Sequence, residues 1–474
     1  MFIISVFGDD NMASNTGKIE MCSGPLFKNI IKFTVPFMLT AFLQHLYNAA
    51  DVIVVGRYAG EEALAGVGTT SSLTTLILNM FLGLSVGVSV SLGRALGAKN
   101  EDDVHKIVHT AIPLSIISGA VVSVIGIFFA EPLLNLIDVP DNVMPQAKIY
   151  MQIIFAGQIP SLVYNFGSAI LRAKGDTKRP LYIVTVTGFM NVLLNLWFVM
   201  GFGMKADGVA LATVISQIIS AVVILFILCH QEDSTQLFLS KLKICRKQLA
   251  EIFRIGIPSG LQGVIFSVSN VLIQSSVNSF NSSAAMAGSA AASNVGNFYY
   301  VAINSFYQAS VTFISQNFGA NNLKRIPKII YCCFIGVAFV WVIEVFVTIF
   351  AGEFLVGIYA PDNTEAIVMG VKRLMIIGCT YGICGFMEVM SGALRGIGYS
   401  FTSMVSSVAG VCGVRIIWIF TVFRAFKSFE TLYSCYPVSW FITLILHSAL
   451  FVIAFRKIKR NASEQNLCSE EACQ

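Results

Sequence analysis

KFTVP at residues 32–36 returns as RIGIP at 254–258, and ALAG at 63–66 returns as AMAG at 285–288. Both pairs are separated by 222 positions. An internal match that keeps its spacing along a chain indicates a repeated structural unit. The pattern therefore predicts two similar halves, and the nature of the repeated unit decides the fold.

The same spacing persists along each half. LGAKN at 96–100 matches FGANN at 318–322 at the same offset, and LRAKG at 171–175 matches LRGIG at 394–398 with one residue more. A polar and basic stretch, HQEDSTQLFLSKLKICRKQLAE at 230–251, separates the halves. We interpret it as the linker between two lobes.

Composition defines what is repeated. The chain has 474 residues, of which 55% are hydrophobic and only 12% are charged, whereas soluble domains carry about 25% charged residues. Apolar stretches of roughly 20 residues, long enough to cross a bilayer as a helix, recur along the sequence. We predict twelve such spans, at about 30–56, 69–93, 107–130, 149–171, 180–202, 208–229, 255–280, 288–317, 329–350, 368–394, 402–423 and 436–455.

Six spans fall in each half, and an even number gives both halves the same orientation in the membrane. Parallel repeats of this kind are typical of transporters. We therefore expect an all-α polytopic membrane protein, with twelve transmembrane helices in two six-helix pseudo-symmetric lobes around a central cavity. The expected parts are an N-terminal cytoplasmic segment at 1–29, an N-lobe at 30–229, the linker at 230–251, a C-lobe at 252–456 and a cytoplasmic tail at 457–474.

The positive charges predict the orientation. Most of the 31 lysine and arginine residues fall in loops that lie on one side of the membrane if both termini do, and positive loops stay in the cytoplasm. We expect a multi-pass protein of the cell membrane with both termini cytoplasmic, acting as a monomer. The net charge of +5 then reflects topology, and we expect no nucleic-acid partner.

Asp51 is the most informative charge. It lies in LYNAADVIVVG at 46–56, inside the first span, with Asn48 and Gln44 on the same helical face. An acid at mid-membrane costs roughly 2.5–3.5 kcal/mol on insertion scales, so it normally faces a polar interior and marks an ion path. Asn48 and Gln44 are candidates for the substrate cavity.

Amides and a hydroxyl in later spans complete a candidate ion site. Asn191 and Asn195, in GFMNVLLNLWF, are one helical turn apart, and Thr213 lies in the sixth span. Together with an acid, such oxygen atoms suit a small hard cation such as Na⁺, or a carboxylate that exchanges a proton. The alternative is that these groups merely join helices by hydrogen bonds.

The second half offers further candidates. Glu388 in the tenth span and Arg415 in the eleventh form either a coupling site or a structural ion pair. Glu344 lies near the end of its span, where its side chain would reach the headgroups. Tyr299 and Tyr307 are candidates to line a cavity for flat cations, although ordinary helix packing is the better explanation for each residue taken alone.

These features together resemble one family. The two six-span lobes, LYNAADVIVVG in span one, the Asn-x-x-x-Asn face in span five and the paired LRxxG signatures are similar to the multidrug and toxic compound extrusion (MATE) family over roughly residues 25–456. The resemblance implies a secondary antiporter that exports organic cations or other amphipathic compounds while Na⁺ or H⁺ enters. It implies no resident cofactor and no enzymatic activity.

The resemblance also implies a site, with two departures. Prokaryotic members use an aspartate of span one, an Asn and an Asp of span five and a threonine of span six, which correspond to Asp51, Asn191, Asn195 and Thr213. Asn195 therefore replaces the second acid. In the C-lobe, Phe266 and Cys384 stand where some members carry acids, and Glu388 one turn further on is the candidate substitute.

Other functions remain as alternatives. A lipid-linked oligosaccharide flippase of the same superfamily would need several basic residues in its cavity, and only Arg415 lies deep in a span. A polytopic membrane enzyme would need an acid-paired histidine cluster, which the five histidines do not form in the sequence. A channel is disfavoured because the two-lobe repeat carries no filter-like motif.

The predicted topology has a direct experimental consequence. A single cysteine at Ser240, in an otherwise cysteine-free protein, should resist membrane-impermeant thiol reagents in intact cells because residues 230–251 face the cytoplasm. The same cysteine should react fully after the membrane is permeabilised. Labelling in intact cells would reverse the predicted orientation.

Overall fold

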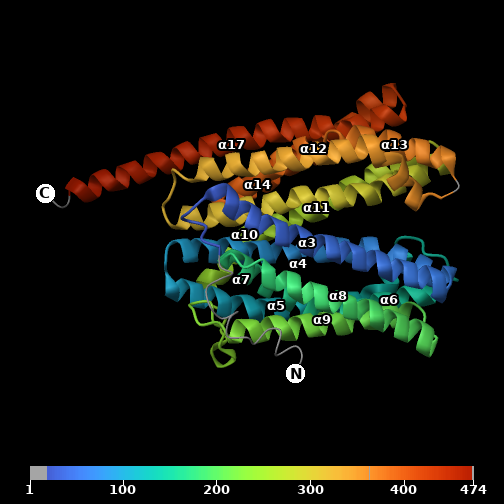
Figure 1. Ribbon diagram of the computed structural model, residues 1–474, viewed down its shortest axis with the longest axis horizontal. Helices are drawn as coiled ribbons and strands as arrows, with labels where there is room; N and C mark the ends of the chain where they lie inside the picture. The colour runs from blue at the N-terminus through green and yellow to red at the C-terminus, as the bar shows by residue number, and fades with distance from the viewer. Residues whose placement is uncertain (1–18, 362, 472–474) are drawn as a thin grey trace. The chain divides into compact units, whose positions relative to one another are not determined.

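The computed structural model describes residues 19–361 and 363–471. These residues form helices joined by short turns, without a β-strand in the described part (Figure 1). The first 18 residues of the expected N-terminal segment and the last three of the expected tail lie outside this part.

The chain divides into two compact units. Within the described residues, unit 1 contains 19–21 and 32–264, and unit 2 contains 22–31 and 265–471. One boundary, between residues 21 and 22, lies in a bend, and the other two, at 31/32 and 264/265, fall inside long helices. The lobe limits read from the sequence, 30–229 and 252–456, remain predictions.

Unit 1 contains the first six spans, except for residues 26–31 at the start of the first helix. Its helices α4, α5, α8 and α9 run side by side in Figure 1. The elements are α3 (Leu26–Val54) with the π-helical turn η1 (Val55–Ala59), α4 (Glu61–Gly97), α5 (Glu101–Asn135), α6 (Met144–Ala156), α7 (Gln158–Lys174), α8 (Lys178–Leu196) with the π-helical turn η2 (Trp197–Gly201), and α9 (Ala206–Cys229).

Unit 2 contains most of the last six spans. The 3₁₀ turn η3 (Leu239–Lys241) precedes them, and α10 begins within unit 1. The elements are α10 (Arg246–Asn278), α11 (Ser283–Gly319), α12 (Ile326–Tyr359), α13 (Thr364–Gly378), α14 (Tyr381–Gly396), α15 (Ser400–Ser407), η4 (Val408–Gly413), α16 (Val414–Trp418), η5 (Ile419–Phe423) and α17 (Phe429–Glu471).

These helices account for the twelve predicted spans. In the described residues, nine helices are long and apolar enough to cross a membrane, and eleven spans result if α6–α7 and α13–α14 each count as one bent span. The remaining span is α11, whose serine, asparagine, glycine and tyrosine residues lower its hydropathy. Its 37 residues exceed the length that a crossing requires.

The sequence repeat has a structural cause at the end of α7 and of α14. Gly175 has φ +98° and Gly398 has φ +91°, a left-handed conformation that costs glycine little and other residues more. The next N–H then bonds back into the helix, from Asp176 to Leu171 O at 2.9 Å and from Tyr399 to Leu394 O at 2.8 Å. The LRxxG signature is therefore a helix stop that is used twice.

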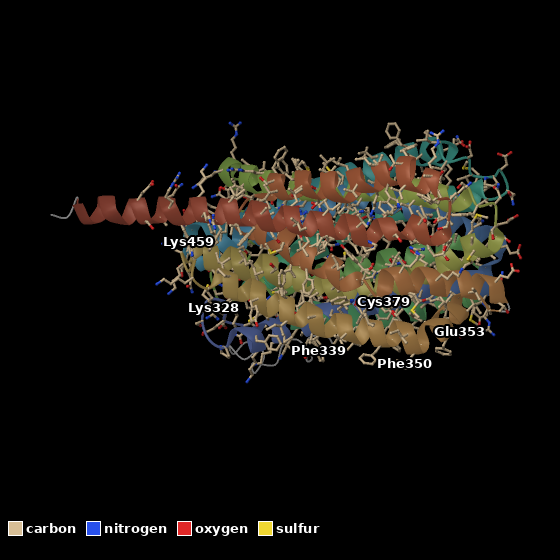
Figure 2. All side chains as sticks on the ribbon, turned by 90° about the horizontal axis from the view of Figure 1, so that it is seen from above. Lys328, Phe339, Phe350, Glu353, Cys379 and Lys459 are labelled. Carbon is tan, nitrogen blue, oxygen red and sulfur yellow. The ribbon has the colours of Figure 1, made fainter. Side chains whose placement is uncertain are left out.

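The outer face of α12 shows how the helices meet lipid. Phe339 and Phe350 are 68% and 80% exposed and project away from the other helices, between Lys328 near one end and Glu353 near the other (Figure 2). Large exposed apolar side chains would be a liability in water but are expected on a surface that hydrocarbon covers.

The segment between α9 and α10 is shorter than the predicted linker, and side-chain contacts attach it to α5 and α7. Because α10 begins at Arg246, only residues 230–245 separate α9 from α10, as non-helical chain and one 3₁₀ turn. Asp233 pairs with Lys174 of α7, and the Phe238 N–H donates to His109 Nε2 of α5 at 3.1 Å. Burial alone would raise the pKa of Asp233, but hydrogen bonds from Lys174 and Thr235 lower it to about 2.

Removing the carboxylate should loosen this segment. We expect Asp233→Asn to weaken its attachment by about 1–2 kcal/mol, because Lys174 loses a charged partner. Limited proteolysis in detergent micelles at pH 7 should then cleave within 230–245 faster than in wild type. The exposed neighbour Glu232 provides the control as Glu232→Gln, with unchanged cleavage.

The same pair predicts a pH dependence. The folded-state pKa of Asp233 lies below its ordinary value of 3.8, so the stabilisation is complete above about pH 4 and is lost as the pH falls toward 2. As the pH falls from about 4 to about 2, the rate at which an acid-active protease cleaves the wild-type protein should therefore rise in a step. The Asp233→Asn protein should show no such step. An acid step of equal size in both proteins would contradict the assignment.

Candidate functional site

Four side chains predicted from the sequence meet in unit 1. Asn195 Nδ2 of α8 donates a hydrogen bond to Asp51 Oδ1 of α3 at 2.5 Å. Thr213 Oγ1 of α9 lies 3.5 Å from Asp51 Oδ2, and Asn191 Nδ2 donates to Thr213 Oγ1 at 3.3 Å. Two consecutive helices, α8 and α9, thus converge with the distant α3 on one carboxylate.

The group is shielded from solvent. Asp51 is 8% exposed, Asn191 is 6% exposed and Asn195 is fully buried. Burying a carboxyl group is costly unless donors satisfy it, and the Asn195 amide and Thr213 hydroxyl provide them. Asn195 also donates to Asn191 Oδ1 at 3.4 Å, so the two amides predicted one turn apart contact each other.

One acceptor in this group is unused. Asn195 Oδ1 is buried and has no hydrogen-bond partner among the described residues. A buried amide oxygen without a donor is unfavourable. It is therefore an available ligand for a cation or for a proton-carrying group.

The backbone around the site departs from a regular α-helix. The π-helical turn Val55–Ala59 begins four residues after Asp51, and the π-helical turn Trp197–Gly201 begins two residues after Asn195. Such turns are rare and are frequent at functional sites. On this side the site is closed by an apolar cluster that includes Val54, Val199 and Val209.

The chemistry of the site is that of oxygen ligands. A carboxylate, two amide oxygens and a hydroxyl suit a hard monovalent cation or a proton better than a transition metal. In the part of the chain that the structure describes, no group of three or more His, Cys, Asp or Glu side chains that could hold a metal ion occurs.

The other candidates of unit 1 lie outside this group. Gln44 and Asn48 are both exposed, while Asp51 on the same helix is buried. The helical face read from the sequence therefore changes environment along its length. The assignment of Gln44 and Asn48 to a substrate cavity remains a prediction.

In unit 2, the predicted pairing of Glu388 with Arg415 is wrong. Arg415 is 5% exposed, donates from Nε to Ser439 Oγ at 3.2 Å and stacks on the Tyr436 ring at 4.0 Å. Glu388 is 7% exposed on α14, and no ion pair joins it to Arg415 in the described part of the chain. Helical spacing could place both charges in the core but could not show which neighbour each would meet.

Two further expectations change. Glu344 does not reach the headgroups, because it is 4% exposed and neither carboxyl oxygen has a hydrogen-bond partner among the described residues. Tyr299 and Tyr307 are buried, with the Tyr299 hydroxyl bonded to Thr348 at 3.1 Å and the Tyr307 hydroxyl accepting from Arg395 at 2.5 Å. In this structure their hydroxyl groups serve helix packing.

Sequence reasoning missed Arg373. It counts as one of the outer loop charges in the predicted topology, yet it lies on α13 and hydrogen-bonds with Ser289 of α11. The small residues of α11 next to it were a usable signal, because a row of serine, alanine and glycine at helical spacing leaves room for a long side chain.

The fold and this site define a polytopic membrane transporter built from two similar helical units. A family model described as MatE matches residues 36–197 and 258–421, once in each half. Since the matches cover more than half of the chain, the protein belongs to the MatE family, as the resemblance implied. Its relatives are transporters and not enzymes.

The names of similar proteins are consistent with this family. The chain is 26% identical over 384 residues to the "Probable multidrug resistance protein YoeA" of Bacillus subtilis (strain 168), covering 79% of this chain and 82% of that protein. It is 23% identical over 392 residues to the "FAD transporter" of Shewanella oneidensis, and the match covers 81% of this chain and 85% of that protein.

Solved structures share the fold. An outward-facing multidrug resistance MATE family transporter of the MOP superfamily superposes with a TM-score of 0.87 at 20% identity, over 94% of this chain and 99% of that chain. The all-α, two-lobe, twelve-helix architecture predicted from the sequence is therefore confirmed.

The Asn195→Asp variant should show whether a charge at residue 195 changes the ion dependence of transport. A carboxylate in place of the amide would lie next to Asp51, where the two repel unless a cation or proton lies between them. If Na⁺ drives transport, the Na⁺ concentration for half-maximal transport should fall roughly tenfold, equivalent to about 1.4 kcal/mol. If H⁺ drives it, the pH optimum of transport should rise instead.

The control is Asn165→Asp, which adds the same charge at another amide of unit 1, on α7. It should leave both quantities unchanged. An Asn195→Asp protein that folds normally and keeps both wild-type values would show that residue 195 does not act on Asp51 during transport.

Proposed function

We propose that this protein is a secondary antiporter that exports organic cations or other amphipathic compounds in exchange for Na⁺ or H⁺, by alternating access of its two lobes. The observation that carries the proposal is Asp51, a buried carboxyl group inside a membrane span, contacted by Asn195 and Thr213 from two other helices. Intramembrane acids of this kind are typical of ion and proton pathways.

The ligand set supports either driving ion. Na⁺ would be held by Asp51, Thr213 and the unpartnered Oδ1 of Asn195, with Asn191 as the fourth contributor. H⁺ would bind Asp51 itself, and its loss would restore a charge that the Asn195 amide stabilises. Both reactions change the charge of one group that links three helices.

The setting of this activity follows the topology. We infer a cell-membrane location with both termini in the cytoplasm, from the distribution of lysine and arginine. The names of the relatives include both multidrug resistance and FAD transport, which supports export of amphipathic molecules of more than one charge type.

Reconstitution tests the proposal. Purified protein in liposomes should transport the zwitterionic drug norfloxacin when either a Na⁺ gradient at equal pH or a pH gradient without Na⁺ is imposed, and the effective gradient identifies the ion. Asp51→Asn should reduce gradient-driven transport by at least about a hundredfold, because it removes the titratable charge at almost constant volume.

The matched control is Asp141→Asn, an exposed acid between α5 and α6, which should transport like wild type. Wild-type transport by the Asp51→Asn protein at equal amounts of folded protein would refute the coupling role. Norfloxacin movement that responds to neither gradient would refute antiport.

A further inference from the structure

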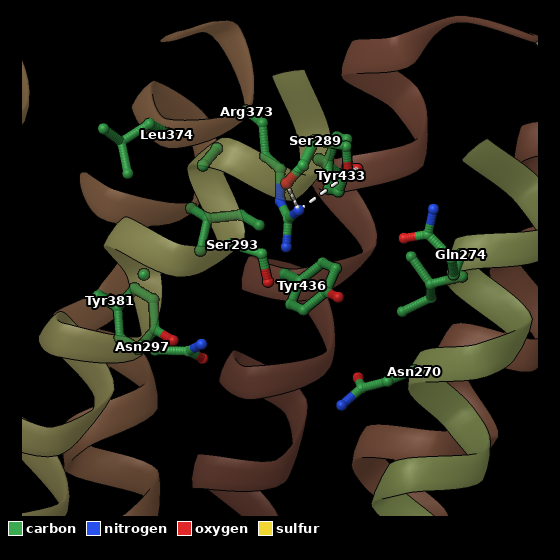
Figure 3. A pocket seen from close by; sticks show the side chains of 14 residues that line it. Asn270, Gln274, Ser289, Ser293, Asn297, Arg373, Leu374, Tyr381, Tyr433 and Tyr436 are labelled. Carbon is green, nitrogen blue, oxygen red and sulfur yellow. Dashed lines mark hydrogen bonds between the residues drawn. The ribbon is translucent and has the colours of Figure 1, made fainter. Parts of the chain in front are cut away.

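Unit 2 contains a pocket of ≈ 220 Å³ (Figure 3). It exists because α11 presents four small residues at helical spacing on one face, Ser289, Ala292, Ser293 and Gly296. The other walls come from α10, α13, α14 and α17. The larger polar residues that line it are Asn270, Gln274, Asn297, Arg373, Tyr381, Tyr433 and Tyr436.

Close helix packing places Arg373 in this pocket. A Cβ atom on Gly288 would lie 2.2 Å from Ala366 O and 2.7 Å from Gly370 N, so α11 and α13 approach each other as only glycine permits. Arg373 follows Gly370 by one helical turn. Its Nη1 donates to Ser289 Oγ at 2.8 Å, and its guanidinium group lies 4.9 Å from the Tyr433 ring.

The pocket is electropositive. Arg373 is the only charged side chain among its described lining residues, and no ion pair joins it to a carboxylate in the described part of the chain. Its Nε and Nη2 have no hydrogen-bond partner there either. Figure 3 shows the guanidinium group between Ser289, Ser293 and Tyr436, directed toward the interior.

A second arginine reinforces this charge. Arg415 stacks on the ring of Tyr436 at 4.0 Å, and Tyr436 is a wall of the pocket. Arg415 also pairs with no carboxylate among the described residues, since its hydrogen bond goes to the Ser439 hydroxyl. Two guanidinium groups without acidic partners in a poorly screened environment favour a bound anion.

The internal repeat relates this pocket to the acid site of unit 1. Ile273, which lines the pocket, follows Asp51 by the 222 residues that separate the matched segments. A Cβ on Gly66 would lie 2.9 Å from Ala147 N, and a Cβ on Gly288 would lie 2.7 Å from Gly370 N. Gly370 thus corresponds to Ala147, and Arg373 corresponds to Tyr150.

The two units therefore carry opposite charges at equivalent places. Unit 1 has a carboxyl group where unit 2 has the apolar Ile273, and unit 2 has a guanidinium group where unit 1 has the phenol of Tyr150. The same helical framework can thus hold a cation in one unit and an anion in the other.

We propose that the unit 2 pocket binds the phosphate or carboxylate group of an amphipathic aromatic compound, with Arg373 as its charged ligand and Tyr381 and Tyr436 against its flat part. At ≈ 220 Å³ the pocket is smaller than sites that enclose a whole drug-sized molecule. It takes one end of the compound. If the protein exports what this pocket binds, its transported compounds carry a negative group. Binding in the pocket does not depend on the proposed export function, and only the step from binding to export rests on it.

Flavin binding to the purified full-length protein in detergent tests this. Flavin mononucleotide and riboflavin share one ring system and differ by a phosphate, so wild type should bind the former at least about tenfold more tightly. Arg373→Gln should weaken flavin mononucleotide binding by about tenfold to a hundredfold and leave riboflavin unchanged, because it removes a charge-assisted hydrogen bond.

Two variants separate charge from folding. Arg373→Lys keeps the charge and should retain most of the preference for flavin mononucleotide, while Arg424→Gln removes an exposed arginine after η5 and should change nothing. A wild-type protein that does not distinguish the two flavins would overturn the proposal. So would an Arg373→Gln protein that keeps the preference or loses both flavins equally.

Two further measurements distinguish a transported compound from a lipid headgroup as the bound anion, and distinguish binding in the pocket from ion coupling at Asp51. Excess phosphatidylglycerol in the micelles should not displace flavin mononucleotide, and competition that depends on Arg373 would assign the pocket to lipid headgroups instead of cargo. Asp51→Asn protein should bind flavin mononucleotide like wild type. A failure of ion coupling and a failure of the pocket are therefore distinguishable.

Discussion

Every polar group inside a membrane span must find a partner within the protein, because hydrocarbon offers none. Asp51 illustrates the consequence. Its carboxyl group is tolerated inside α3 only because Asn195 and Thr213 reach it from two other helices. The requirement joins α3, α8 and α9 at one point, so any change in the charge of Asp51 acts on three helices at once.

The same requirement shapes unit 2 with different residues. Arg415 is accommodated by a serine hydroxyl and the face of Tyr436, and Arg373 by Ser289 and Tyr433. Hydroxyl groups and aromatic faces satisfy a guanidinium group without neutralising it. Each arginine therefore keeps a net positive charge inside the lobe, whereas a carboxylate partner would have cancelled it.

Duplication explains how one protein can combine these sites. The glycine contacts that set the distance between the second and fourth spans of each unit are equivalent, through Gly66 in one and Gly288 in the other. Backbone packing is thus retained, while side chains at equivalent positions differ in charge. Close helix contacts at glycine residues and the glycine-containing helix ends fix the backbone of each unit. The side chains that line the two sites can therefore differ in charge without a change of fold.

The sequence by itself determined the twelve spans, the two-unit repeat and the four residues that meet at Asp51, counting Asp51 itself, because hydropathy, repeat spacing and helical period are properties of the chain. Only the tertiary structure decided the partners. The Arg415–Glu388 pairing failed, Glu344 turned inward and Arg373 entered a pocket, because which buried groups meet depends on helix rotation and on the approach of neighbours. Spacing along one helix shows which residues share a face, but the partner on the opposite helix lies from 24 residues away, for Arg415 and Ser439, to 162 residues away, for Asp51 and Thr213.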